Sequence, residues 1–195
     1  MRLRGIVLGA WVELRRRTGG AAYKRWSDEE NLDSDWDGRT FRLGEFVPPG
    51  STVLEFGAGR RVLEERLPEG VTYIPSDLVD RGPGTFVCNL NKLPLPEFPA
   101  HDVVLLSGLL EYVNDVPHLI ATLSSPPDRT GLIICSYAIA EKNDPRRRMQ
   151  GWVNDYTTSS LREVFARAGY LCTHQEDWHR QRLFVFELAA AHGHG

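Results

Sequence analysis

Short apolar segments alternate with helical segments between residues 51 and 168, and this alternation restricts the possible folds more than any other feature of the sequence. The apolar runs contain β-branched residues and are too short for helices, so we expect buried strands at 52–56, 71–74, 85–88, 101–106 and 131–135. The spacing of apolar residues predicts helices at 62–67, from Asn114–Asp115 onward, and at 157–168. Strands that alternate with helices indicate a parallel sheet covered by helices on both faces.

The last part of this pattern differs from the rest. Residues 170–178 and 182–188 follow one another with only a short turn between them and are expected to form a hairpin. The hairpin would add an antiparallel strand at one end of the sheet. We therefore expect an α/β fold, a three-layer α-β-α sandwich around a mostly parallel sheet.

The N-terminal region is predicted to be helical. Apolar residues recur in residues 3–17 at the spacing of one helix face, and Gly19–Gly20 is expected to end this amphipathic helix. The helix could pack on the domain or cover a ligand pocket, or its arginines could hold it against an anionic membrane surface. Residues 27–38 are acidic and rich in turn formers, which predicts a loop, and they lack the spacing of a calcium-binding loop.

Charge and cysteine content narrow the class of protein. The chain has 195 residues and a formal net charge of -3, which argues against a nucleic-acid partner. No apolar run is long enough to span a membrane. Its three cysteines, Cys88, Cys135 and Cys172, are far apart and show no metal-binding spacing, so we expect free thiols, no metal site and a cytoplasmic location.

Polar residues and glycines stand where the expected strands end. In a parallel sheet, ligands collect at the carboxyl ends of the strands. Gly57 and Gly59, just after Glu55, would let the backbone approach a ligand closely. Asp77 ends the next strand, where a carboxylate can accept both hydroxyls of an adenosine ribose. Alternatively, the glycines serve only a tight turn and Asp77 caps a helix.

Taken in chain order, these segments resemble the motifs of class I S-adenosylmethionine-dependent methyltransferases. Residues 53–60 (VLEFGAGR) are similar to the first motif, V-L-[DE]-x-G-x-G, and 73–77 (YIPSD) to the second strand with its ribose-binding acid. Residues 93–95 with 101–104 resemble the stretch that enters the fourth strand, and 107–112 (SGLLEY) resemble the motif S-x-x-L-E-[HY]. Residues 156–170 are similar to the last helix and its A-G-[FY] turn. The resemblance covers about 50–188 and implies a Rossmann-like sheet of seven strands with the last antiparallel.

The resemblance also implies S-adenosylmethionine as the cofactor. It places Glu55, Gly57 and Gly59 at the methionine end, with Ala58 between the glycines, and Asp77 at the ribose. The other implied cofactor-binding residues are Leu78 after Asp77, then Cys88, Asn89 and Leu90 beside the adenine, and Ser107, Gly108 and Leu109 near the sulfonium. Two positions depart from the family pattern: Arg61 replaces a frequent third glycine, and Asn89 replaces an aspartate that often binds the adenine amino group.

The acceptor is expected to be a small molecule that is methylated at a hydroxyl oxygen by in-line transfer. The S-G-L-L that follows the fourth strand differs from the N-P-P-Y associated with amino-group methylation of bases, and the ligands of metal-dependent catechol-type relatives are not evident. The loop at 138–155 could bind the acceptor. Its candidate substrate-binding residues are Arg146, Trp152 and Asn154, and candidates for a general base are Tyr137, His118 and Tyr156. Alternatively, the arginines form only a solvated surface, Trp152 serves local packing, and His118 and Tyr137 lie in the core or on the surface.

Two other functions compete with this interpretation. A non-catalytic protein of the same fold could act as a binding module, which would agree with Arg61 and Asn89. A nicotinamide oxidoreductase would need glycine where Val62 stands. We expect one domain, in which 1–50 form a helical lid segment, 51–188 the methyltransferase-like part and 189–195 a flexible tail. The protein is expected to be a monomer or a homodimer.

Overall fold

The computed structural model describes residues 20–126, 129–142, 147 and 150–189. The amphipathic helix predicted at 3–17 lies outside these residues, together with its possible membrane contact, and so does nearly all of the predicted tail.

A seven-stranded sheet in the order β3-β2-β1-β4-β5-β7-β6 forms the centre of the molecule. Its strands are β1 (Thr52–Phe56), β2 (Thr72–Asp77), β3 (Phe86–Val87), β4 (Val103–Leu106), β5 (Leu132–Tyr137), β6 (Tyr170–Trp178) and β7 (Gln181–Leu188). Strand β7 pairs antiparallel with both β5 and β6, and the other pairs are parallel. The predicted mostly parallel sheet with an antiparallel last strand is confirmed.

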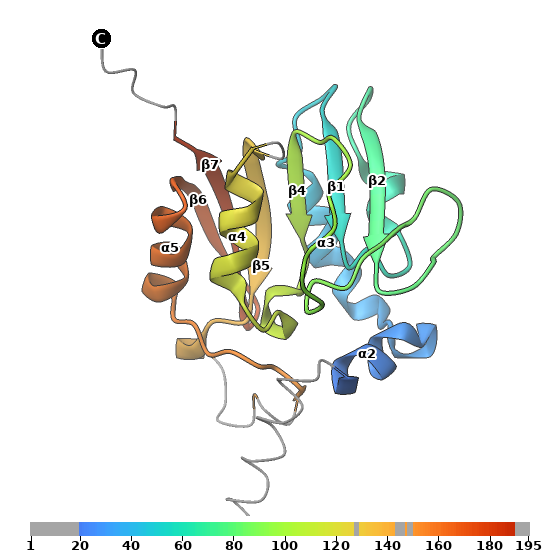
Figure 1. Cartoon of the computed structure of the whole chain (residues 1–195), viewed down its shortest axis with the longest axis horizontal. Coiled ribbons are helices and arrows are strands. Elements are labelled where there is room, and N and C mark those ends of the chain that lie inside the picture. The colour runs from blue at the N-terminus through green and yellow to red at the C-terminus, as the bar shows by residue number, and fades with distance from the viewer. Residues whose placement is uncertain (1–19, 127–128, 143–146, 148–149, 190–195) are drawn as a thin grey trace, which may run out of the picture.

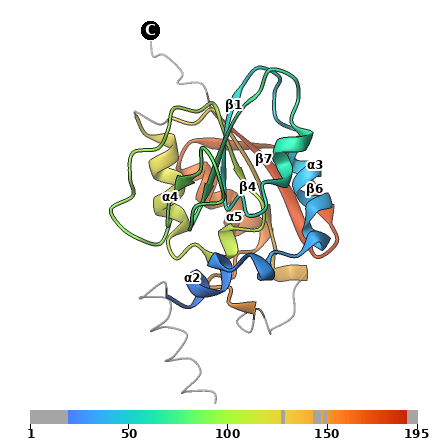
Figure 2. The same ribbon diagram turned by 90° about the vertical axis from the view of Figure 1, so that its right-hand side faces the viewer.

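Helices cover the sheet on two faces (Figures 1 and 2). Helices α4 (Val116–Ser124) and α5 (Thr158–Arg167) lie on one face, and α3 (Asp37–Gly44) lies on the other, next to the 3-10 turn η3 (Val62–Arg66). The side chain of Asp115 accepts a hydrogen bond from the backbone of His118 and so caps α4. Thr157 and Ser160 form a reciprocal capping box at the start of α5.

Two apolar clusters hold these layers together. Leu43 and Val47, on and just after α3, pack with the residues of β1, β4 and β5 that face them, including Val53 and Ile134. The larger cluster fills the space under α4 and α5, where Phe165 stacks on Phe186 of β7 with ring centroids 3.7 Å apart. Burial on both faces explains why β4 reads as an uninterrupted apolar run.

The region before β1 differs from the sequence prediction. Gly20, expected to end a helix, begins helix α2 (Gly20–Ser27), and the predicted loop at 27–38 contains two 3-10 turns, η1 (Glu29–Asn31) and η2 (Ser34–Trp36), and the start of α3. Asp28 and Asp33 cap the two turns by accepting backbone N–H groups two residues later. Helix α3 escaped prediction because it has only eight residues and its sequence, DGRTFRLG, holds two glycines, which disfavour a helix.

The topology creates a crevice at the carboxyl ends of β1 and β4. The chain leaves β1 through η3 on one face, whereas it leaves β4 through α4 on the other face. Such a switch point leaves room beyond the strand ends. Helix α2 lies across this end of the sheet, below the arrowheads of β1, β2 and β4 in Figure 1. In the described part of the chain, no helix has the length and apolarity needed to cross a membrane.

Candidate functional site

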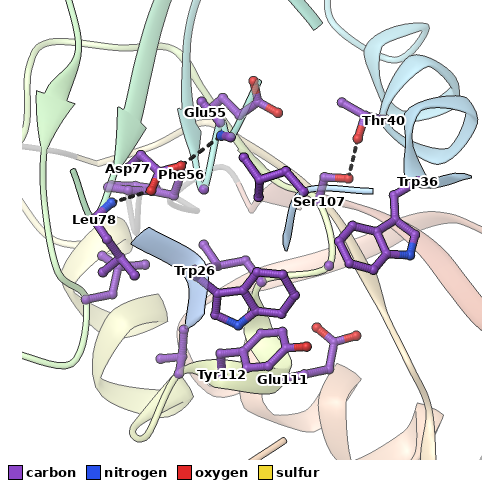
Figure 3. Close-up of a pocket in the computed structure, with 18 of the residues that line it drawn as sticks. Trp26, Trp36, Thr40, Glu55, Phe56, Asp77, Leu78, Ser107, Glu111 and Tyr112 are labelled. Carbon is purple, nitrogen blue, oxygen red and sulfur yellow. Dashed lines mark hydrogen bonds between the residues drawn. The ribbon is translucent and has the colours of Figure 1, made fainter. Parts of the chain in front are cut away.

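A pocket of about 360 Å³ occupies the crevice at the carboxyl ends of β1, β2 and β4 (Figure 3). Its walls come from the turns after these strands, from α2 and α3 with the segment between them, and from Gln150, Trp152, Arg180 and Gln181. Every residue that the sequence implied for the cofactor lines this pocket: Glu55, Gly57, Ala58, Gly59, Asp77, Leu78, Cys88, Asn89, Leu90, Ser107, Gly108 and Leu109. The sequence motifs thus meet in one cavity.

The turn after β1 and the end of β2 are joined by hydrogen bonds. Gly57 and Gly59 have φ angles of 73° and 52°, values that side-chain-bearing residues rarely adopt. This conformation aims the backbone N–H of Gly59 at Oδ2 of Asp77 (2.8 Å), while Oδ1 accepts the N–H of Leu78 (2.6 Å). Residues 78–85 contain no helix, so the alternative in which Asp77 caps a helix is wrong. Each carboxylate oxygen keeps a lone pair for a further donor.

An arginine links Asp77 to the cover of the pocket. Arg81 Nε lies 3.4 Å from Oδ2 of Asp77, and both side chains are buried. The guanidinium also donates to the backbone carbonyl groups of Trp26 and Ser27, at the end of α2. The position of α2 over the pocket therefore depends on the same arginine that neutralises Asp77.

Glu55 lies at the floor of the pocket. Its side chain is buried, and Oε2 accepts a hydrogen bond from the hydroxyl of Tyr73 (2.6 Å). Burial raises the pKa of Glu55 to about 8, against the opposing effect of the Tyr73 hydrogen bond. At neutral pH this carboxyl therefore stays largely protonated unless a positive charge enters the pocket.

Arg39, on α3, lies beside the turn after β4. It donates from Nε to Oγ of Ser107 (3.0 Å) and from Nη1 to Oε1 of Gln181 (3.1 Å). Desolvation lowers the pKa of this guanidinium, which nearby carboxylates such as Glu111 oppose. Gly108 has a φ angle of 60°, and a Cβ atom there would lie 2.6 Å from Nη1 of Arg39. Glycine at this position thus lets the guanidinium approach the strand end.

The opposite end of the pocket is a slot formed by Leu78, Cys88, Asn89 and Leu90. The backbone N–H of Cys88 donates to the carbonyl of Asp77 (2.8 Å), which fixes the slot relative to the end of β2. Oδ1 of Asn89 accepts the backbone N–H of Asn91 (3.0 Å), so part of this side chain serves a local turn. Burial raises the pKa of Cys88 to about 11, which makes it a poor nucleophile.

Arg61, the other departure from the family pattern, does not line the pocket. Its φ angle of 59° explains why glycine suits this position. The guanidinium pairs with Glu64 (2.9 Å) and donates to the backbone carbonyl of Pro83 (2.8 Å). The substitution therefore adds surface contacts and leaves the glycine turn intact.

Some of the predicted catalytic and substrate-binding residues lie elsewhere. Trp152 lines the pocket, whereas Asn154, Tyr137, Tyr156 and His118 do not. Asn154 donates to the carbonyl groups of residues 110 and 113, and its oxygen accepts the hydroxyl of the fully buried Tyr137. Tyr156 packs against Tyr137 with ring centroids 6.0 Å apart, and His118 is exposed on α4. Arg146 lies outside the described residues.

Several pocket residues were not predicted from the sequence. They are Trp26, Trp36, Arg39, Thr40, Glu111 and Tyr112. Glu111 and Tyr112 belong to the SGLLEY motif, whose position after a strand was a usable signal. The other four come from the N-terminal segment, where no motif marks them. Among the described residues, no group of His, Cys, Asp or Glu side chains could hold a metal ion.

Comparisons with known proteins agree with this geometry. A family model described as "Methyltransferase domain" matches residues 29–175. A search of the curated proteins finds no match.

Solved structures show the same fold. A chain from the complex between the Haloferax volcanii Trm112 methyltransferase activator and a candidate methyltransferase has a TM-score of 0.62 and 17% identity, covering 95% of this chain and 97% of that one. Burkholderia thailandensis 1,6-didemethyltoxoflavin-N1-methyltransferase, solved with 1,6-didemethyltoxoflavin and S-adenosylhomocysteine, has a TM-score of 0.65 and 15% identity over 93% and 90% of the two chains. An S-adenosylmethionine-dependent methyltransferase from Mesorhizobium loti has a TM-score of 0.60 and 19% identity over 78% and 99%.

Proposed function

We infer the function of this protein from one premise: the chain belongs to the methyltransferase-domain family, as a class I S-adenosylmethionine-dependent methyltransferase. We propose that it transfers a methyl group from S-adenosylmethionine to a hydroxyl oxygen of a small molecule. The observation that carries this proposal is the hydrogen-bonded junction of Asp77 with the glycine turn, inside a pocket that every cofactor-implied residue lines. An isolated G-x-G turn would support it far less.

The polar and apolar groups that line the pocket match the parts of this cofactor. Asp77 offers two carboxylate oxygens for the ribose hydroxyls. The slot made by Leu78, Cys88 and Leu90 has apolar side chains, which suit an adenine ring. At the other end, Glu55 and the guanidinium of Arg39 provide opposite charges for the ammonium and carboxylate of the methionine part.

The cofactor supplies, when bound, a methyl group on a positively charged sulfur that is already activated for transfer. The protein then has to orient the acceptor, exclude water and remove a proton. In this proposal, segment 20–44 orients the acceptor and excludes water, because residues of this segment line the pocket. No separate substrate-binding domain is needed.

A small acceptor agrees with the size and charge of the site. The pocket holds about 360 Å³ in total, and the cofactor would occupy much of it. The chain as a whole is nearly neutral, which favours a small molecule over a nucleic acid. The Burkholderia neighbour was solved with 1,6-didemethyltoxoflavin and S-adenosylhomocysteine bound, which supports this choice.

Isothermal calorimetry with S-adenosylmethionine and S-adenosylhomocysteine tests the proposal. We expect binding of both in the micromolar range. Failure to bind either at millimolar concentration would overturn the assignment. Binding without transfer of radiolabelled methyl to any fraction of small-molecule extracts would favour the non-catalytic alternative.

A further inference from the structure

One end of the pocket is lined by aromatic rings. Trp26, Trp36 and Tyr112 contribute to this wall (Figure 3), and Trp152 also lines the pocket. The ring of Trp26 packs edge-to-face on Trp36 (centroids 5.7 Å apart) and on Tyr112 (5.2 Å). The indole N–H of Trp152 donates to the hydroxyl of Tyr112 (3.0 Å). These contacts fix the rings relative to one another, so the wall has a defined shape before any acceptor arrives.

A buried carboxyl group adjoins the aromatic wall. The Glu111 side chain lines the same pocket next to Tyr112, and the residue is only 1% exposed. Its Oε1 accepts the backbone N–H of Ala138 (2.7 Å), at the end of β5. Its Oε2 is buried and has no hydrogen-bond partner within the described part of the chain. Such an oxygen is costly to bury, so a hydrogen-bond donor on a ligand would be stabilised there.

Burial and the neighbouring charges have opposite effects on the pKa of Glu111. Burial raises its pKa, while hydrogen bonds from the backbone N–H groups of Glu111 and Ala138 and the charges of Arg39 and Arg147 lower it. The other titratable groups that interact with it are Tyr112, Cys135 and Tyr137. Burial thus favours the protonated form of this carboxyl, whereas the charges of Arg39 and Arg147 favour the carboxylate form that a base requires.

From these two features, we propose that the acceptor is a flat aromatic molecule with a hydroxyl group, whose ring lies against Trp26, Trp36 and Tyr112 and whose hydroxyl proton passes to Oε2 of Glu111. The inference rests on the proposed function and names its substrate class and its base. The acceptor oxygen forms the new C–O bond as its O–H bond breaks. The C–S bond breaks at the same time, its electron pair remains on sulfur, and Glu111 becomes a neutral carboxylic acid.

A cationic acceptor fits the same wall less well. Arg25 already lies over the ring of Trp26, with its guanidinium carbon 4.6 Å from the ring centroid. Both Arg25 and Arg39 line the pocket. A second positive charge at this end would be repelled, whereas a neutral aromatic ring would not.

The substrate class is tested by binding, in the presence of saturating S-adenosylhomocysteine. The probes are 2-naphthol, 4-hydroxyquinoline and 7-hydroxycoumarin, and the control is decahydro-2-naphthol, which keeps the hydroxyl but is neither flat nor aromatic. We expect at least one flat probe to bind at least tenfold more tightly than the control. Equal or weaker binding of all three would overturn the aromatic class. Calorimetric binding of S-adenosylhomocysteine in the same samples would leave the proposed function standing.

Substitutions at Tyr112 test the wall itself. Tyr112→Leu removes a ring and should abolish the preference for the flat probe. Tyr112→Phe keeps the ring and removes only the hydroxyl that Trp152 contacts, so it should retain the preference. The proposal fails if both variants, with unchanged cofactor binding, still discriminate between the flat and the saturated probe.

The role of Glu111 is tested with Glu111→Gln. Glutamine retains an oxygen for the N–H of Ala138 but cannot accept the proton. We expect cofactor affinity and thermal unfolding close to those of the wild type, and a fall in kcat for the best flat acceptor on the order of 100-fold at pH 7. The acceptor KM should change much less.

The pH profile separates a base from a structural residue. The wild-type kcat should fall on the acid side as Glu111 becomes protonated, and the variant should lose this limb. The deficit of the variant should shrink at alkaline pH, where the probe hydroxyl ionises by itself. An unchanged kcat, or a deficit that is constant across pH, would refute the assignment of Glu111 as the base.

Discussion

The contribution of Asp77 to cofactor binding can be tested quantitatively with Asp77→Ala. In the structure each oxygen of this carboxylate has one backbone N–H donor, from Leu78 at 2.6 Å and from Gly59 at 2.8 Å, and can accept one ribose hydroxyl in addition. A hydrogen bond to a charged group contributes about 1.5 kcal/mol or more. Loss of two such bonds should therefore weaken S-adenosylhomocysteine binding by about 3 kcal/mol, or roughly 100-fold.

The assay is isothermal calorimetry with S-adenosylhomocysteine and its 2′-deoxy analogue. The matched control is Asp80→Ala, because Asp80 is exposed on the same loop and, within the described part of the chain, its side chain accepts a hydrogen bond only from the backbone N–H of Gly82 (2.9 Å). We expect the control to bind both ligands like the wild type. The wild type should favour the full ribose, and Asp77→Ala should bind the two ligands about equally, since the residue that distinguishes them is absent.

Two results would refute this reasoning. An affinity of Asp77→Ala within a few-fold of the wild type would mean that the ribose is held elsewhere. Equally, a full preference for the 2′-hydroxyl in the variant would mean that the loss reflects a loosened glycine turn or an unpaired Arg81. A thermal unfolding curve for each variant separates loss of contact from loss of fold.

Three further predictions concern glycine geometry and the ionisation of two glutamates. Gly108→Ala should lower the melting temperature and cofactor affinity because its Cβ would lie 2.6 Å from a guanidinium nitrogen, whereas Gly84→Ala, with φ of 81° and open space, should show only a small thermal shift from backbone strain. Because burial raises the pKa of Glu55 to about 8, the unfolding free energy measured in urea should fall as pH rises from about 4.5 to 8, and Glu55→Gln should flatten this slope. Hydrogen bonds from Arg42 lower the pKa of Glu176 to about 2, so the pair stabilises the fold above about pH 4.5 and progressively less toward pH 2. The difference in melting temperature between the wild type and Arg42→Gln should therefore shrink as the pH falls over this range. A constant difference would contradict this linkage.

The sequence was sufficient to predict the sheet and a set of residues that meet in one pocket at the strand ends, because both depend on local patterns. The length and residue pattern of the apolar runs identify the strands. Gly57 and Gly59 identify a turn whose backbone conformation residues with side chains rarely adopt. Asp77 was found by its place at the end of the next strand. The structure adds the contact that local pattern could not supply, the hydrogen bond from Gly59 to its carboxylate.

The acceptor end could not be predicted, because its walls come from segments far apart in the chain. Trp26 and Trp36 lie in a stretch without periodicity, and only tertiary contact brings them against Tyr112. Tyr137 and Asn154 show the opposite error of sequence reasoning. They are polar residues at the end of a strand and in a loop, as site residues often are, yet they bind each other and satisfy buried carbonyl groups.

The two buried glutamates in the pocket differ in their partners more than in their burial. Both have a pKa raised by desolvation. Glu55 receives the hydroxyl of Tyr73 and lies between the strand ends, where the cofactor ammonium would convert it to a carboxylate. Glu111 keeps one oxygen without a donor among the described residues, and the charges of Arg39 and Arg147 oppose the effect of burial on its pKa. This difference in partners supports the proposal that Glu55 serves the methyl donor and Glu111 the methyl acceptor.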